Sequence, residues 1–267
     1  MKTEARIKTA TKTLAELAGL LLMTGLLSAT LLAEPAAAAR YDNQIQTSVT
    51  QKLSAKSQFR NVQTSVEDGI VTLSGSVDLY QRKLDAAKLA RKAAHVQGVR
   101  NLIDVAGPVI SDAELEQKLA QKLRYVREGY DITFDYFALN VKDGVVTVVG
   151  QDRTGVGRDE ALADIQNMPG VKDVIDQITL EPVSPMDDGL RLRTARAIYR
   201  DSVLSKYAID PAQPIRIIVN NGHITLYGSV DNQMDKNVAG IRANQMFGAF
   251  SVENKLVVGN DSSQQGM

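Results

Sequence analysis

The sequence contains no cysteine and no tryptophan, and only two of its 267 residues are histidines. The absence of cysteine excludes disulfide scaffolds, thiolate zinc sites and cysteine nucleophiles. Acidic and basic residues number 31 each, so the chain lacks the basic excess of a general nucleic-acid binder. At 44% hydrophobic and 23% charged residues, the composition is that of an ordinary folded protein.

Residues 1–39 have the order of a secretory signal peptide. Basic residues between Lys2 and Lys12 precede an apolar run from Leu17 to Ala33, and alanines at 36–39 provide the small residues of a cleavage site. We therefore predict cleavage after Ala39 and an exported, periplasmic protein. The alternative is a retained membrane anchor, because the run approaches the roughly 20 residues that span a bilayer.

Three copies of one sequence pattern fill the rest of the chain. Residues 65–75, 140–150 and 218–228 each contain Asp-Gly or Asn-Gly, an apolar-Thr-apolar triplet and a second glycine six residues after the first. Asp-Gly and Asn-Gly between alternating apolar and polar residues predict a β-hairpin. The second glycine interrupts a strand, which indicates a bulge or the close approach of a helix. The glycines of these hairpins are Gly69, Gly75, Gly144, Gly150, Gly222 and Gly228.

A second anchor follows each hairpin. Gly98, Gly170 and Gly248 each precede a polar residue by six positions, and apolar segments at 102–106, 174–180 and 252–258 surround these polar residues and predict a third strand. We expect the polar side chains, Asp104, Asp176 and Asn254, to cap backbone bends, because one ligand per unit is too few for a metal site.

Helices are expected on both sides of each hairpin. In the first copy, Leu84, Ala87, Ala90 and Ala94 recur at helical spacing between the hairpin and the third strand. In the second copy, Ser111 and Glu114 form a capping box ahead of a helix with one apolar face. The unit is therefore helix, strand, strand, helix, strand.

This combination of motifs resembles the BON domain, named for bacterial osmotically inducible and nodulation proteins. The predicted fold class is α+β, with three tandem αββαβ domains that each form a mixed three-stranded sheet faced by two helices. We place the domains at 40–107, 111–182 and 187–259, followed by a disordered tail at 260–267. The second copy departs from the pattern at Gly155–Gly157, where a short segment replaces the alanine-rich helix. The resemblance implies an envelope location and a non-enzymatic role in phospholipid or envelope-protein binding under osmotic or other stress.

Residues for catalysis have little support in the sequence. His95 stands near the end of a predicted helix, and His223 follows a turn at a position that is apolar in the other copies. An exposed strand residue is the simpler interpretation of His223. We predict no enzymatic activity, no cofactor and no metal.

The distribution of charge suggests a binding surface. Residues 42–107 hold nine basic and six acidic side chains, residues 111–183 eight and fourteen, and residues 187–259 nine and seven. Clustered basic residues on helices attract anionic lipid head groups. The alternatives are solvated helix faces, or basic outer units that pair with the acidic middle unit. The candidates for lipid binding are Arg82, Lys83, Lys88, Arg91, Lys92, Arg191, Arg193, Arg196 and Arg200.

Aromatic residues gather in the second copy, in the longer link before its hairpin. Tyr130, Phe134 and Tyr136 are candidates for binding an unfolded or assembling envelope protein, as a chaperone or adaptor would. The alternative is that they cover the edge of a core, because an ordered link must bury something. The sequence leaves the oligomeric state open.

Overall fold

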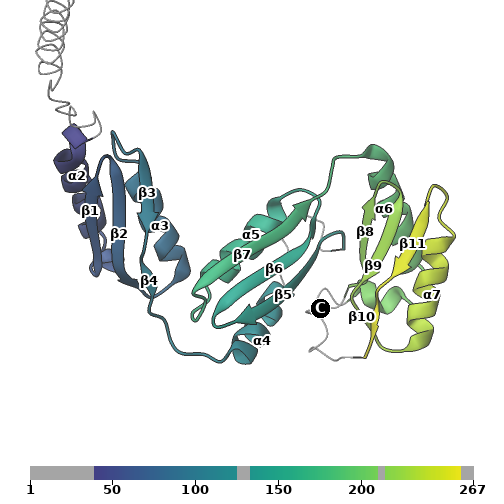
Figure 1. Cartoon of the computed structure of the whole chain (residues 1–267). Helices are drawn as coiled ribbons and strands as arrows, with labels where there is room; N and C mark the ends of the chain where they lie inside the picture. The colour runs from purple at the N-terminus through teal and green to yellow at the C-terminus, as the bar shows by residue number, and fades with distance from the viewer. Residues whose placement is uncertain (1–38, 125–132, 210–213, 260–267) are drawn as a thin grey trace, which may run out of the picture.

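The chain folds into three successive αββαβ units in a computed structural model, which describes residues 39–124, 133–209 and 214–259 (Figure 1). Each unit is built on a mixed sheet with helices packed against it, so the predicted α+β class is confirmed. The predicted signal peptide, apart from Ala39, and the predicted disordered tail lie outside the described residues. In the described part of the chain, no helix is both long and apolar enough to cross a bilayer.

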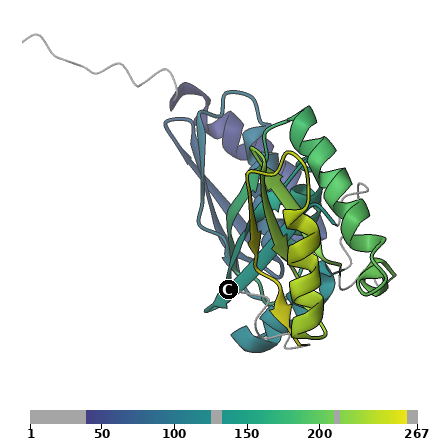
Figure 2. The ribbon, with the colours of Figure 1, turned by 90° about the vertical axis from the view of Figure 1, so that its right-hand side faces the viewer.

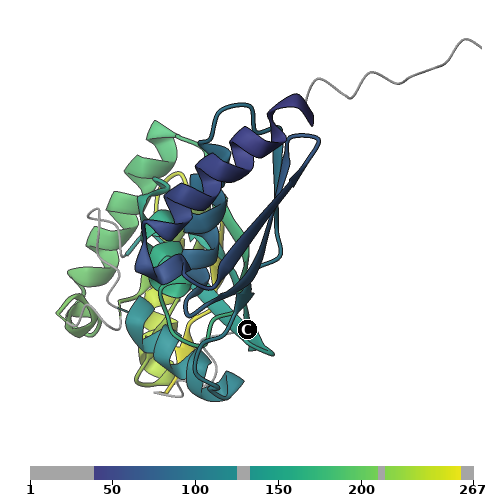
Figure 3. The same cartoon turned by 90° about the vertical axis from the view of Figure 1, so that its left-hand side faces the viewer.

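The first unit joins an antiparallel hairpin to a parallel third strand. β1 (Val62–Glu67) pairs antiparallel with β2 (Ile70–Val77), and β2 pairs parallel with β3 (Gly98–Asn101) and the short β4 (Asp104–Val105). α2 (Asp42–Ser54) and α3 (Tyr80–Arg91) pack against the sheet (Figure 3), with short 3-10 turns at Ala39–Tyr41 and Ser57–Phe59. Val49, Leu73 and Ala90 are fully buried between these layers, which confirms the helix predicted from its alanine spacing.

The second unit repeats this arrangement. α4 (Asp112–Leu123) begins where the Ser111 hydroxyl accepts a hydrogen bond from the Glu114 amide, as the capping box predicts. β5 (Tyr136–Lys142) and β6 (Val145–Asp152) form the hairpin, and β7 (Asp173–Leu180) pairs parallel with β6. α5 (Val156–Gln166) is a full helix of 11 residues, so the departure from the sequence pattern at Gly155–Gly157 does not remove the second helix of this unit.

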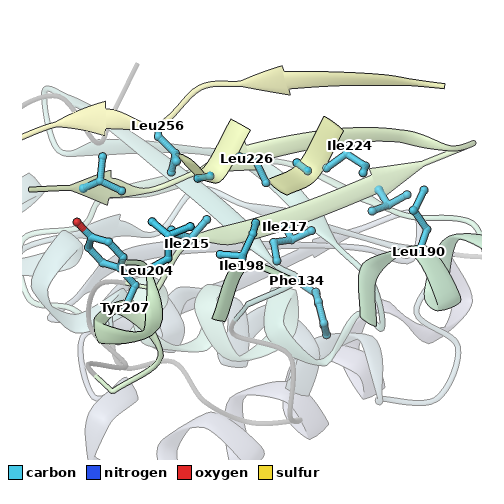
Figure 4. Packing of buried hydrophobic residues seen from close by; sticks show 14 residues of the cluster. Phe134, Leu190, Ile198, Leu204, Tyr207, Ile215, Ile217, Ile224, Leu226 and Leu256 are labelled. Atoms are coloured by element: carbon cyan, nitrogen blue, oxygen red, sulfur yellow. The ribbon is translucent and has the colours of Figure 1, made fainter. Parts of the chain in front are cut away.

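The third unit has the same arrangement of two helices on a mixed sheet. α6 (Pro185–Tyr199) and α7 (Gln233–Asn244) pack on β8 (Arg216–Asn220), β9 (His223–Tyr227) and β11 (Ser251–Asn254). A 3-10 turn (Ser205–Ala208) and the short parallel pair β10 (Ser229–Val230) and β12 (Val257–Val258) complete the unit. Figure 4 shows Leu190, Ile198, Ile217 and Leu226 within one cluster of buried side chains.

Each hairpin turn is held by an aspartate from the first helix of the same unit. The carboxylate of Asp42 accepts hydrogen bonds from the Asp68 and Gly69 amides, at 2.9 and 2.8 Å. Asp112 binds the amides of residues 143 and 144 in the same way, and Asp187 binds those of residues 221 and 222. Both turn residues have positive φ in all three copies, as the Asp-Gly and Asn-Gly motifs predict.

The second glycine of each hairpin allows the first strand to approach closely. A Cβ atom at Gly75 would collide with the carbonyl oxygen of Asn61, and one at Gly150 would collide with that of Tyr136. At Gly228 the obstructing atom is the carbonyl oxygen of Pro214, at 2.7 Å. The close neighbour is therefore the backbone that leads into the first strand, and not a helix.

The prediction that Gly98 is the equivalent of Gly170 and Gly248 is wrong by three residues. Gly170 and Gly248 have positive φ, but the corresponding turn residue of the first unit is His95, with φ of 66°, whereas Gly98 lies in β3 without that conformation. Asn101 consequently takes the role predicted for Asp104. Its side chain accepts from the Ile103 amide, as Asp176 does from Ile178 and Asn254 from Leu256.

These two glycines of the first unit give a matched stability test. Gly75→Ala places a Cβ against the Asn61 carbonyl at a φ of 100°, so we expect the free energy of unfolding to fall by at least about 2 kcal/mol. Gly98→Ala meets nothing closer than 4.0 Å and should change it by less than about 1 kcal/mol. Urea unfolding followed by circular dichroism measures both. Equal effects of the two substitutions would contradict this account of the repeat.

Candidate functional site

Three of the nine basic candidates are paired or covered, and six are exposed and unpaired among the described residues. Arg82 is paired with Asp78 at 2.6 Å, Lys83 is half-buried, and Arg191 is buried at 2% exposure. The other six side chains are exposed, and none of them makes an ion pair with a residue that the structure describes. These six are Lys88, Arg91 and Lys92 at the end of α3, and Arg193, Arg196 and Arg200 along α6.

Helical spacing explains why each group of three shares a face. Residues 88, 91 and 92 are three and four positions apart, so their side chains emerge together from the last turn of α3. Residues 193, 196 and 200 follow the same rule along α6. The result is two patches of three positive charges on two different units.

Arg191 belongs to the contact between the second and third units. Its guanidinium binds the carboxylate of Glu181, which follows β7, and the backbone carbonyl of Val219 in β8. It also pairs with Asp188 at 2.6 Å, and Asp188 pairs in turn with Arg153 of the second unit at 3.2 Å. Arg191 is therefore not available to lipid, and for this residue the alternative of pairing with the acidic middle unit is correct.

This ion pair matters for stability because both of its side chains are buried. Glu181 is almost fully covered, and desolvation raises the pKa of its carboxyl group although the Arg191 charge acts to lower it. A buried carboxylate is tolerated only with a partner that compensates its lost hydration. The orientation of α6 relative to β7 thus depends on Arg191.

The first and second units also touch. Tyr80, at the start of α3, lies in the core cluster of the second unit, where burial and the neighbouring Asp173 carboxylate raise the pKa of its hydroxyl to about 12. Leu84 packs against the same cluster. One end of α3 is therefore anchored on the second unit, while its last turn carries the exposed basic patch.

The aromatic candidates are occupied by the contact between the second and third units. Phe134 is buried at the edge of the third unit's core (Figure 4), and Tyr136 stacks on Tyr227 with ring centroids 3.9 Å apart. The Ile217 amide donates to the Thr133 carbonyl at 2.6 Å, which brings this link alongside β8. Phe134 thus lies in a core, as the alternative interpretation expected, whereas Tyr136 is partly covered by its stacking on Tyr227. Tyr130 lies outside the described residues.

Two cavities lined by described residues contain charged side chains, and one of about 560 Å³ lies between Lys118, Lys122, Glu160 and Asp164. A cavity of about 300 Å³ at the junction of the first two units includes Asp112, Asp143 and Lys172 in its lining. The Asp112 carboxylate in this lining already binds the turn amides. Within the described ranges, no three histidine, aspartate or glutamate side chains are grouped as a metal site would require.

One feature of the surface was missed by sequence reasoning. Phe247 and Phe250, in the loop between α7 and β11, are 93% and 77% exposed. The repeat pattern consists of residues that the three copies share, whereas these two phenylalanines occur at positions that differ from copy to copy. Comparison of the unshared positions would have revealed them.

The family model of the BON domain matches residues 41–107, 111–182 and 197–260, one match in each structural unit and together more than half of the chain. The chain belongs to the BON domain family. BON domains are associated with membrane and phospholipid binding and are generally not catalytic. The three tandem domains predicted from the glycine pattern are thus confirmed.

Comparison with other proteins adds little beyond the family. Two structures of CdsD, titled a structural protein of the type III secretion system of Chlamydia trachomatis, are similar to this BON protein at 15% and 14% identity. The first covers 80% of this chain and 92% of that one, the second, of the C-terminal domain, 81% and 96%, each with a TM-score of 0.22. The comparison with curated proteins gave no match.

The buried ion pair leads to a stability prediction. Arg191→Met leaves the Glu181 carboxylate buried without its cation, so we expect the third BON domain to lose about 3–5 kcal/mol of unfolding free energy. Removal of the cation raises the pKa of Glu181 further. The folded state then binds the proton more tightly than the unfolded state, so the deficit should shrink as pH falls from neutral through the folded-state pKa toward the ordinary glutamate value.

The control for this prediction is Arg193→Met, two positions along the same helix and exposed. It should change stability by no more than about 0.5 kcal/mol at any pH. Urea unfolding across the pH range measures both variants. A loss for Arg191→Met that does not diminish toward acid pH would contradict the role given to Glu181.

Proposed function

We propose that this BON protein is an exported, non-enzymatic protein of the cell envelope that binds anionic phospholipid surfaces through its basic helices. The observation that carries the proposal is the pair of exposed basic patches, Lys88, Arg91 and Lys92 on α3 and Arg193, Arg196 and Arg200 on α6. The association of BON domains with phospholipid supports it.

The energetics suit weak, reversible binding. A basic side chain near an anionic membrane surface contributes roughly 1 kcal/mol, and this contribution decays within about 10 Å at 0.1 M salt. Three such charges on one helix support only a loose attachment, while two patches on one chain reinforce each other. The N-terminal charges and apolar run support export, and a role in osmotic stress remains a prediction from the family.

Binding to vesicles tests the proposal. We expect the chain from Arg40 onward, which contains all three described cores, to sediment with anionic vesicles at low salt and much less with zwitterionic vesicles. Charge reversal of the α3 patch (Lys88→Glu, Arg91→Glu and Lys92→Glu) or of the α6 patch (Arg193→Glu, Arg196→Glu and Arg200→Glu) should each weaken binding at least about tenfold.

A matched reversal separates these patches from total charge. Lys52, Lys56 and Arg60 are also exposed in the first domain, and Lys52→Glu, Lys56→Glu and Arg60→Glu together change the net charge by the same amount. This triple variant should bind nearly as well as the unmodified chain. Equal losses in all three triple variants would show that only net charge matters, and no sedimentation of the unmodified chain would refute the proposal.

A further inference from the structure

Two phenylalanines stand in solvent on the third domain. Phe247 and Phe250 are largely exposed, whereas every other phenylalanine and tyrosine of the described ranges is at least half-covered. Aromatic rings are the side chains that gain most from leaving water. Two of them uncovered in one short loop mark a surface that contacts something apolar.

The backbone of this loop does not depend on aromatic rings, although the Phe250 ring lies against the turn at Gly222, with its centroid 6.0 Å from that of His223. The Phe250 amide donates to the Gly222 carbonyl at 2.8 Å, and the amides of Gln97 and Lys172 make the same bond to residues 69 and 144 of their own turns. The three loops are therefore equivalent in backbone. Where the third domain has Phe247 and Phe250, the first has Ala94 and Gln97 and the second has Pro169 and Lys172. The pair is a property of the third domain alone.

The loop lies beside the basic face of α6. A guanidinium nitrogen of Arg193 is 3.4 Å from the Phe247 carbonyl oxygen, and Figure 2 shows the end of α7 next to this helix. Arg196 follows one turn further along the same face. Apolar rings beside arginines match the chemistry of a bilayer surface, in which acyl chains lie beneath phosphate groups.

The charge of the surroundings favours an anionic lipid surface over a second copy of the chain. The two aromatic side chains bury about 300–500 Å² together, about half of the roughly 800 Å² that each partner contributes to a stable protein interface. A second copy would also bring the arginines of two molecules together. A fluid lipid surface needs no complementary shape and supplies the opposite charge.

We propose that the α7–β11 loop inserts Phe247 and Phe250 into the interfacial layer of an anionic phospholipid bilayer while Arg193 and Arg196 contact the phosphate groups. This inference rests on the proposed function and names the element that enters the membrane. It assigns the third domain a task that the first two domains do not share.

The first domain supplies the test variant. Phe247→Ala with Phe250→Gln installs the residues that the same backbone carries at 94 and 97, so folding should survive, as thermal unfolding would verify. All basic residues are kept. We expect binding to vesicles of phosphatidylcholine and phosphatidylglycerol to fall at least about tenfold. Met234→Ala, at the opposite end of α7 and 62% exposed, is the control and should bind normally.

The absence of tryptophan allows a direct measurement of insertion. Phe247→Trp gives a chain with one tryptophan, whose emission should shift to shorter wavelength and be quenched by brominated lipid when vesicles are added. Met234→Trp should do neither. Normal binding of the double variant, or an unshifted emission from bound Phe247→Trp, would overturn insertion while leaving the proposed function intact.

The remaining outcomes are also decisive. If the unmodified chain does not bind anionic vesicles, the proposed function and the insertion both fail. If it forms dimers without lipid and the double variant does not, by analytical ultracentrifugation, the loop is a self-association surface and the insertion proposal is wrong.

Discussion

An aspartate at the start of the first helix holds the hairpin turn in each of the three BON domains. Asp42, Asp112 and Asp187 each accept hydrogen bonds from two successive turn amides. A carboxylate that receives two backbone donors forms strong, charge-assisted bonds and fixes both direction and distance. The first helix is thereby tied to the hairpin on which it packs.

The contact between the second and third domains, unlike the contact between aspartate and turn, is not repeated along the chain. Arg191 and Glu181 meet inside it, and Phe134 fills the edge of the neighbouring core. The same contact buries Arg191 and Phe134 and partly covers Tyr136. Arg193, only two positions from Arg191, remains in solvent because two residues correspond to a rotation of about 200° around the helix, which places it on the opposite face of α6. Packing between domains therefore selects which charges of a cluster can meet a ligand.

The hairpins and the first-copy helix could be predicted because their signals are local: a turn dipeptide, a glycine six residues later and a helical period. The aspartate that holds the turn could not, since the chain between it and the turn lengthens from copy to copy and obscures the alignment. The prediction for the first copy was wrong because a histidine replaces the turn glycine. His95 adopts the positive φ of Gly170 and Gly248, so the glycine pattern indicated Gly98 as the turn residue and Asp104, in place of Asn101, as the capping residue. The burial of Arg191 depends on a neighbouring domain that no local pattern describes.

Repetition also changes how function can be read from such a chain. Residues shared by the three domains serve the fold, since each occupies a turn, a close approach, a capped bend or the buried face of the hairpin. Residues that differ at equivalent backbone positions are free of those demands, and their chemistry reflects what each domain contacts. Ala94 and Gln97, Pro169 and Lys172, and Phe247 and Phe250 occupy one loop geometry with three different surfaces. Only the last pair consists of large apolar side chains, whose exposure to water is unfavourable. That loop is therefore where the triplicated fold acquires an asymmetric, apolar contact with its surroundings.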